Sequence, residues 1–323
     1  MSKKPLRVAI LGASGIGKNH AGWFQKNGTE VCAFSGTSPE SVAHTGEVLR
    51  QRLGYVPAGY FDVSQLLQSE KPDAVCIATP PELHFEHVQT CLNHNVPVLC
   101  EKPLVYDGAL PGEVLIRQAD ALVQLAREKS LLLGTQMQYC LIAGKLCELS
   151  GVIAEDITSF KMEMETKNLK PGRSHETVWI ELAPHPLSML QKIAGVSELQ
   201  LGSIRCDIGA METIASFQVQ RLEGSTIDAK IIVRCNPEAS TPVRRFTLNG
   251  VAIDYSGRKN ASGDFLTYLA SRNETFEMPD LVDMLIANFI AACNGEEKLA
   301  VTGADGAQNV AWLVQIMERG KCA

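Results

Sequence analysis

The sequence predicts an α/β domain with a doubly wound parallel sheet, residues 1–136, followed by an α+β domain with a large, mostly antiparallel, open-faced sheet, residues 137–323. A length of 323 residues suits two domains of ordinary size. Up to about Gln136, short apolar runs alternate with amphipathic helical segments, which is typical of a parallel sheet. From about Ile157 the segments are alternating or β-branched with few helices between them, which indicates an antiparallel sheet.

The first strand, Leu6 to Leu11, runs directly into a glycine-rich turn, residues 12–17. Such a turn before a helix brings backbone N–H groups and the positive helix end close to a pyrophosphate. The dinucleotide fingerprint requires glycine at three places, and Ser14 stands at the middle one. An ordinary structural turn is the alternative. We expect cofactor contacts from Gly12, Ser14, Gly15, Ile16 and Gly17.

The second strand, Glu30 to Phe34, is followed by small hydroxyl residues, and no acidic residue stands there before Glu40. An acidic residue near this point usually holds the ribose of a cofactor without a 2′-phosphate. Its absence favours NADP(H) over NAD(H), with contacts from Ser35, Gly36 and Thr37. The alternative is a simple helix cap at Ser38, and NAD(H) stays possible.

Two further strands, Ala74 to Ala78 and Val96 to Cys100, flank a helical pattern. Since the carboxyl ends of parallel strands line the ligand crevice, Thr79-Pro80-Pro81 and Glu101-Lys102-Pro103 are expected to face one another. A lysine desolvated in a cleft can titrate near neutral pH. We therefore predict that Lys102 is a positioned proton donor or a substrate clamp; a solvated loop lysine is the alternative.

The remaining elements follow from the same patterns. They are a helix over 113–129, strands over 131–133, 158–165, 203–206, 214–220, 227–234 and 244–248, and helices over 281–293 and 306–319.

Composition limits the classes of molecule that the protein is expected to bind. A net charge of -6 without a block of like charges argues against nucleic acid and membrane surfaces, and no apolar run reaches the length of a membrane span. The amino-terminal residues pass directly into a strand without a signal-peptide pattern, so a cytoplasmic protein is expected. The ten cysteines form no C-x-x-C pair, so no metal site is predicted, and a small-molecule substrate fits best.

Four segments carry a resemblance to a known family: GASGIGKNHA from Gly12, KPDAVCIATPPELH ending at His84, VPVLCEKPL ending at Leu104, and VTGADGAQNV from Val301. The chain is similar to the glucose-fructose oxidoreductase and inositol dehydrogenase (Gfo/Idh/MocA) family, which pairs a Rossmann domain with a sheet-rich second domain. The resemblance implies that Lys102 reaches the nicotinamide and substrate, that Glu101 lies by the nicotinamide ribose, and that the peptide before Pro103 is cis. Further cofactor contacts are expected from Thr79, Pro80 and His84.

The resemblance also implies an acidic residue and a histidine four positions apart, matched here by Glu181 and His185, with the histidine exchanging a proton with the reacting oxygen. Glutamate replaces the family's aspartate. Because Pro184 and Pro186 bracket His185, a helix can hold it only in its first turn, and Glu181 would then precede that helix. A structural loop histidine is the alternative.

A polar segment, residues 166–179, leads into this pair and carries Arg173, which we expect to bind an acidic substrate group; a solvated loop is the alternative. At Gln138-Tyr139 the family's more basic motif is missing, so the substrate cannot be inherited from better-known sugar enzymes.

These observations predict an NAD(P)-dependent dehydrogenase or reductase that transfers a hydride between nicotinamide and a hydroxyl or carbonyl carbon of a sugar, sugar acid or cyclitol. His185 would take the hydroxyl proton while Lys102 stabilises charge on the oxygen. A reductase of a tetrapyrrole or imine, and a non-catalytic nucleotide-binding sensor, remain open. An open-faced sheet favours a homodimer or homotetramer through the second domain.

Overall fold

The computed structural model describes residues 4–167, 176–261 and 265–321, and it divides into two compact units. Unit 1 comprises Met1–Gln136 and Val282–Val310, and unit 2 comprises Met137–Leu281 and Ala311–Ala323. The sequence prediction placed residues 282–310 in the second domain. They belong to unit 1 because the apolar face of their helix packs there, with the ring of Phe289 edge-on to that of Phe24.

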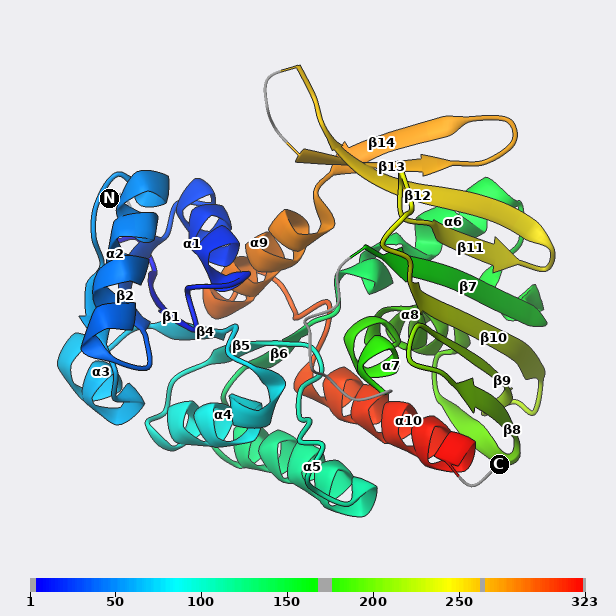
Figure 1. Ribbon diagram of the computed structural model, residues 1–323, viewed down its shortest axis with the longest axis horizontal. Helices are drawn as coiled ribbons and strands as arrows, with labels where there is room; N and C mark the ends of the chain where they lie inside the picture. The colour runs from blue at the N-terminus through cyan, green and yellow to red at the C-terminus, as the bar shows by residue number, and fades with distance from the viewer. Residues whose placement is uncertain (1–3, 168–175, 262–264, 322–323) are drawn as a thin grey trace. The chain divides into compact units, whose positions relative to one another are not determined.

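Unit 1 is a parallel six-stranded sheet with the strand order β3-β2-β1-β4-β5-β6, so the predicted doubly wound α/β fold is confirmed (Figure 1). The strands are β1 Arg7–Leu11, β2 Glu30–Ser35, β3 Ala58–Tyr60, β4 Ala74–Ile77, β5 Val98–Glu101 and β6 Leu133–Gln136. The helices are α1 Gly17–Lys26, α2 Pro39–Leu53, α3 Val63–Glu70, α4 His84–Asn93, α5 Gly112–Glu128, and α9 Leu281–Cys293 from Val282 on. Of these, β3 and α3 were not predicted. Strand β3 has only three residues, which is too short for a recognisable strand pattern.

Two groups of helices cover the sheet of unit 1. Helices α1, α2 and α9 share one apolar core with β1, β2 and β4, whereas α3, α4 and α5 contact one another. Every residue of β4 is buried, as a central strand covered on both sides requires. The carboxyl ends of β1, β4 and β5 consequently lie at one edge, where the predicted cofactor segments begin.

Unit 2 is an eight-stranded sheet with the order β14-β13-β12-β11-β7-β10-β9-β8, antiparallel except between β7 and β10, which confirms the predicted second fold. Its strands are β7 Ser159–Thr166, β8 Ser197–Ile208, β9 Glu212–Arg221, β10 Thr226–Cys235, β11 Arg244–Leu248, β12 Val251–Lys259, β13 Phe265–Ala270 and β14 Thr275–Pro279. The elements on one face include η2 Gln138–Ile142, α6 Ala143–Ser150, α7 Thr177–Leu182 and α8 Pro184–Ala194. The end of α10 (Gly303–Lys321) also packs in this unit, against β8.

Three strands at one edge of this sheet, β12 to β14, were not predicted. In β12 and β14 nearly all residues are exposed or half-buried, so the alternation that marks a half-buried strand is weak there. Strand β8 also begins earlier than expected, with an irregular register between Gln200 and Arg205.

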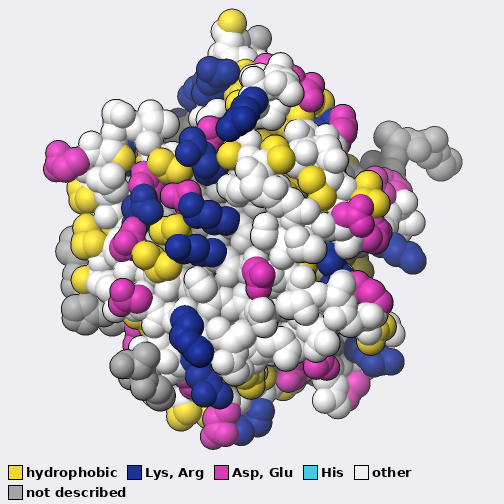
Figure 2. Space-filling view, turned by 90° about the vertical axis from the view of Figure 1, so that its right-hand side faces the viewer, with side chains coloured by type: hydrophobic (Ala, Val, Ile, Leu, Met, Phe, Trp, Pro, Cys, Tyr) yellow, Lys and Arg dark blue, Asp and Glu magenta, His cyan; other side chains and the backbone are white. Residues whose placement is uncertain are grey.

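The face of the sheet that points away from these helices, here called the outer face, is polar. Arg234 lies 3.1 Å from Glu165 and 2.8 Å from Glu212, and Arg245 lies 2.7 Å from Asp254. Figure 2, viewed from the right-hand side of Figure 1, shows Lys and Arg side chains interspersed with Asp and Glu. Many charges of the outer face are thus already paired within the chain. None of the described helices has the length and apolar character needed to cross a bilayer.

Candidate functional site

The glycine-rich turn between β1 and α1 is shaped by close backbone packing. Gly12 has a φ of +82°, and a Cβ at this position would lie 2.7 Å from the Ala78 oxygen and the Thr79 nitrogen. A Cβ on Gly17 would lie 2.6 Å from the Gly12 oxygen. Only glycine fits at these two places, because one needs the left-handed region and both lack room for a side chain. They hold β1, β4 and α1 together.

The outer part of the same turn is open. Ser14, Gly15 and Ile16 are exposed, and a Cβ added to Gly15 would meet nothing within 4 Å. Helix α1 starts without a side-chain cap and without an acidic residue in its first turn, which instead carries Lys18. Uncapped N–H groups and the helix dipole favour an anion at such an end. These residues fit the pyrophosphate of a dinucleotide.

Two serines of the segment after β2 already make hydrogen bonds within the protein. Ser35 is buried, and its Oγ accepts a hydrogen bond from the Gly12 N–H at 3.3 Å. Ser38 caps α2 by accepting from the Ser41 N–H, so the helix-cap alternative is confirmed. Thr37 and Glu40 are exposed. Hydrogen bonds from its own backbone N–H and from Ser38 lower the pKa of the Glu40 carboxyl. An ionised carboxylate here would repel a 2′-phosphate.

The Glu-Lys-Pro turn follows β5, and its Lys102–Pro103 peptide is cis, as the resemblance implied. One oxygen of Glu101 lies 3.1 Å from His20 Nε2, and the other accepts the Lys102 backbone N–H at 3.1 Å. Burial alone would raise the pKa of Glu101, but His20 and then Lys102 outweigh it and lower the pKa. The turn therefore presents an ionised carboxylate directly beside the half-buried Lys102.

His84 holds this turn from the other side. Its Nδ1 lies 2.8 Å from the Pro103 oxygen and its Nε2 lies 2.9 Å from the Thr79 oxygen, and the ring is fully buried. Burial, more than any other cause, lowers the pKa of His84. The ring therefore lies between the ends of β4 and β5, where a neutral imidazole can donate to one of the two carbonyl oxygens, and its contact with the cofactor stays a prediction. Thr79 is half-buried and Pro80 is exposed at this edge.

In unit 2, His185 lies in the first turn of α8, as its flanking prolines require. The preceding helix α7 ends at Leu182, but the chain stays helical through Ala183, whose N–H donates to the Trp179 oxygen. Glu181 and His185 are thus four residues apart on an almost continuous helical path. The expectation that Glu181 precedes the helix of His185 is confirmed, and Glu181 lies near the end of α7.

His185 packs against Tyr139, which in turn contacts Tyr255 and Arg244. The buried ring of Tyr139, from η2, stands edge-on to the imidazole with the ring centres 5.0 Å apart. Tyr139 also packs against Tyr255 at 5.1 Å, and its hydroxyl accepts a hydrogen bond from Arg244. Burial, chiefly, raises the pKa of Tyr139, so this hydroxyl stays neutral. Such packing fixes the plane of the imidazole.

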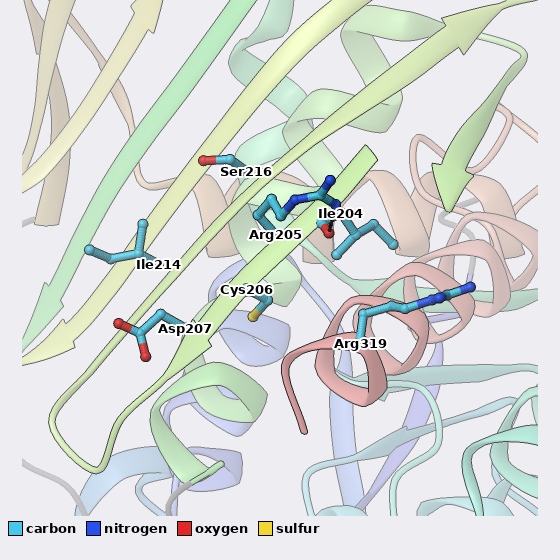
Figure 3. Close-up of a pocket in the computed structure, with 7 residues that line it drawn as sticks. All are labelled: Ile204, Arg205, Cys206, Asp207, Ile214, Ser216 and Arg319. Carbon is cyan, nitrogen blue, oxygen red and sulfur yellow. Dashed lines mark hydrogen bonds between the residues drawn. The ribbon is translucent and has the colours of Figure 1, made fainter. Parts of the chain in front are cut away.

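Other places in the described residues add nothing to this site. A shallow pocket of about 570 Å³ in unit 2 is lined by residues of β8, β9 and the end of α10, among them Arg205 and Arg319, and by none of the predicted site residues (Figure 3). No three His, Cys, Asp or Glu side chains of the described ranges cluster as metal ligands would. Arg173 lies outside the described residues.

Comparison with known proteins finds a family match over the amino-terminal part of the chain. Residues 6–137 match the GFO_IDH_MocA model, described as an oxidoreductase family with an NAD-binding Rossmann fold. This segment of unit 1 is thus similar to that family. A D-glucoside 3-dehydrogenase of Escherichia coli is 32% identical over 105 residues, covering 32% of this chain and 28% of the relative. An inositol 2-dehydrogenase of Rubrobacter xylanophilus is 28% identical over 186 residues, covering 56% of this chain and 50% of the relative. The chain thus matches half or less of these relatives' lengths.

Solved structures resemble the whole chain. A UDP-N-acetylglucosamine 3-dehydrogenase from Acidithiobacillus ferrooxidans aligns with a TM-score of 0.75 and 19% identity, covering 99% of both chains. An inositol dehydrogenase homologue from Azotobacter vinelandii, complexed with NADH and myo-inositol, aligns with a TM-score of 0.73 and 15% identity over 99% of this chain and 96% of that one. Both units therefore share the fold of these solved structures.

The sequence analysis missed His20 as a neighbour of Glu101, and it missed Tyr139 with its partner Arg244 beside His185. His20 follows Gly17 by three positions within the quoted GKNHA segment, so one turn of helix could have placed it near the sheet edge. Arg244 stands on the helix-facing side of β11 with Phe246, but the two arginines at 244 and 245 hide which one points inward.

Proposed function

We propose that this protein is a nicotinamide-dependent oxidoreductase that acts on a hydroxyl or carbonyl carbon of a sugar, sugar acid or cyclitol. The observation that carries the proposal is the Glu-Lys-Pro turn: an ionised carboxylate and a lysine stand at the carboxyl ends of parallel strands, beside a glycine turn with an uncapped helix end. The names of the relatives, dehydrogenases of inositol and of a glucoside, support the substrate class.

In this proposal the residues divide the work. A bound nicotinamide would supply the hydride donor or acceptor. The turn at Ser14 and Gly15 would hold the pyrophosphate through backbone N–H groups. Lys102 would hydrogen-bond the reacting oxygen and stabilise the charge that develops on it, and His185 would take or return the hydroxyl proton. Glu181 would assist His185, and Tyr139 keeps the imidazole in one plane.

Both NAD(H) and NADP(H) stay candidates for the cofactor. The absence of an acidic residue directly after β2 favoured NADP(H), but Ser35 faces inward and Glu40 stands exposed in the first turn of α2. Relatives of the same fold are complexed with NADH or NAD+, and the matched family model is described as NAD-binding. These observations do not support the preference for NADP(H).

Assembly through the outer face of the second sheet is also proposed, as a homodimer or homotetramer. An eight-stranded sheet with helices on one side leaves a broad face uncovered. Its paired charges imply a polar interface if the assembly forms.

The alternatives of a tetrapyrrole or imine reductase and of a sensor would use the same turn without His185.

Replacing Lys102 with methionine tests the proposal. Methionine keeps the bulk but removes the donor, so we expect turnover to fall about a hundredfold or more while the affinity for the cofactor stays within about twofold. The variant Lys129→Met, on the exposed end of α5, is the matched control. Near-normal turnover in Lys102→Met would contradict the role of this lysine.

A further inference from the structure

A buried ion pair ties the first helix to the Glu-Lys-Pro turn. His20, in the first turns of α1, is only 1% exposed. Its Nε2 lies 3.1 Å from an oxygen of Glu101 at the end of β5, and its Nδ1 lies 3.2 Å from the sulfur of Cys76 on β4. Both ring nitrogens are therefore engaged by two neighbouring strands, and the imidazole has no room to turn.

The contact continues to Lys102. While one carboxylate oxygen of Glu101 faces His20, the other accepts the backbone N–H of Lys102 at 3.1 Å. The Glu101 side chain keeps 14% of its surface exposed, so it stands at the border between the buried pair and the open edge of the sheet. His20 is thus linked by two hydrogen bonds to the backbone of the lysine proposed to act on substrate.

The electrostatics of the pair favour an imidazolium. Burial lowers the pKa of His20, but the sulfur of Cys76 and the carboxylate of Glu101 outweigh burial and raise the pKa to about 10. The other titratable groups around Glu101 are Cys100, His84 and the ammonium of Lys102. At neutral pH the cation of His20 therefore faces the anion of Glu101.

We propose that His20 is a positioning residue: its imidazolium keeps Glu101 ionised and fixed, and thereby holds the turn that presents Lys102. This inference rests on the proposed function. A buried ion pair is a poor source of net stability, because the desolvation of two charges offsets their attraction. Apolar side chains at these positions would stabilise the core equally well. The ion pair beside Lys102 is therefore explained by a need to keep Glu101 charged and immobile.

Two variants separate positioning from packing. His20→Gln keeps an N–H donor for Glu101 but removes the charge. Phe24→Leu, one turn further along α1 and fully buried, loses packing without touching Glu101. If His20 is charged, stability linked to it is complete below about pH 6.5 and is lost as the pH rises towards about 10. Urea unfolding of the cofactor-free protein across this range should show that loss in wild type and Phe24→Leu, but not in His20→Gln.

Activity supplies the second measurement. Without its cation, Glu101 has a higher pKa, so the acidic limb of the kcat/KM profile of His20→Gln should move to higher pH. We expect kcat to fall about tenfold or more, since small misplacements of reacting groups are costly, with the KM for substrate changed less than about twofold. In a Glu101→Gln background, His20→Gln should have no further effect on kcat.

The two sets of results distinguish the inference from the proposed function. A pH dependence of unfolding or a pH–rate profile in His20→Gln that matches wild type would overturn the positioning role, as would behaviour identical to Phe24→Leu. Wild-type protein that turns over no substrate would refute the proposed function and, with it, the catalytic purpose of His20; the unfolding data would then still decide whether the pair is charged.

Discussion

Replacing Gly12 with alanine should destabilise unit 1 strongly. A left-handed alanine costs about 1 to 2 kcal/mol, and the new Cβ would stand 2.7 Å from the backbone of Ala78 and Thr79. That backbone cannot retreat easily, because the Ala78 N–H donates to the Leu11 oxygen at 2.8 Å. Overpacking of this kind adds about 1 to 3 kcal/mol. The total of about 2 to 5 kcal/mol corresponds to a fall in Tm of roughly 4 to 20 °C.

Gly15→Ala is the matched control three residues away. Its Cβ would meet nothing within 4 Å, so we expect a Tm within about 2 °C of wild type. If the turn holds a pyrophosphate, this Cβ should still weaken NADH binding about tenfold or more by blocking the close approach of the backbone. Calorimetry of the cofactor-free variants and fluorescence titration with NADH give both quantities. A Gly12→Ala variant as stable as wild type, or a Gly15→Ala variant with unchanged affinity, would refute the reasoning.

Three further predictions concern other residues. Tyr139→Ala should lower kcat about tenfold, because it frees the His185 ring. Tyr139→Phe should keep kcat within about threefold and cost about 1 kcal/mol of stability, as measured by steady-state kinetics and urea unfolding. Equal kcat in both variants would contradict the role of Tyr139 in orienting His185. Glu40→Gln should raise the affinity for NADPH over NADH roughly two- to fivefold in paired titrations, with Glu47→Gln as control; no change would place the ribose elsewhere. Analytical ultracentrifugation should give the mass of a dimer or tetramer, and a monomer would contradict assembly through the outer face.

Much of the fold could be predicted because apolar runs and amphipathic helices leave strong periodic signals. The central strand β4 is apolar throughout and β1 is apolar after Arg7, and both strands were predicted from the sequence. The strands β12 to β14 were missed, and in β12 and β14 burial gives no clear alternation. Residues 282–310 were assigned to the second domain but belong to unit 1. Helix α9 is apolar almost all round, so its sequence shows that it is buried but not against which sheet.

The candidate site was predictable in its motifs but not in the internal contacts of those motifs. The exposed turn at Gly15 and the cis peptide at Pro103 follow from recognisable sequence. The inward turn of Ser35, the bridging role of His84 and the pairing of His20 with Glu101 depend on side-chain directions set by tertiary packing. Helical spacing could have placed His20 near the sheet edge, but spacing does not show which side chain its imidazole meets.

The central claim is that this chain binds a nicotinamide dinucleotide and uses it on a polyol or keto-sugar. The most direct measurement titrates the wild-type protein with NADH and NADPH and then follows nicotinamide absorbance with a panel of sugars, sugar acids and cyclitols. We expect binding of at least one cofactor and turnover of at least one such substrate, with turnover lost in Lys102→Met. Binding without turnover on any member of the panel would contradict the proposed substrate class, and no binding of either cofactor would contradict the claim itself.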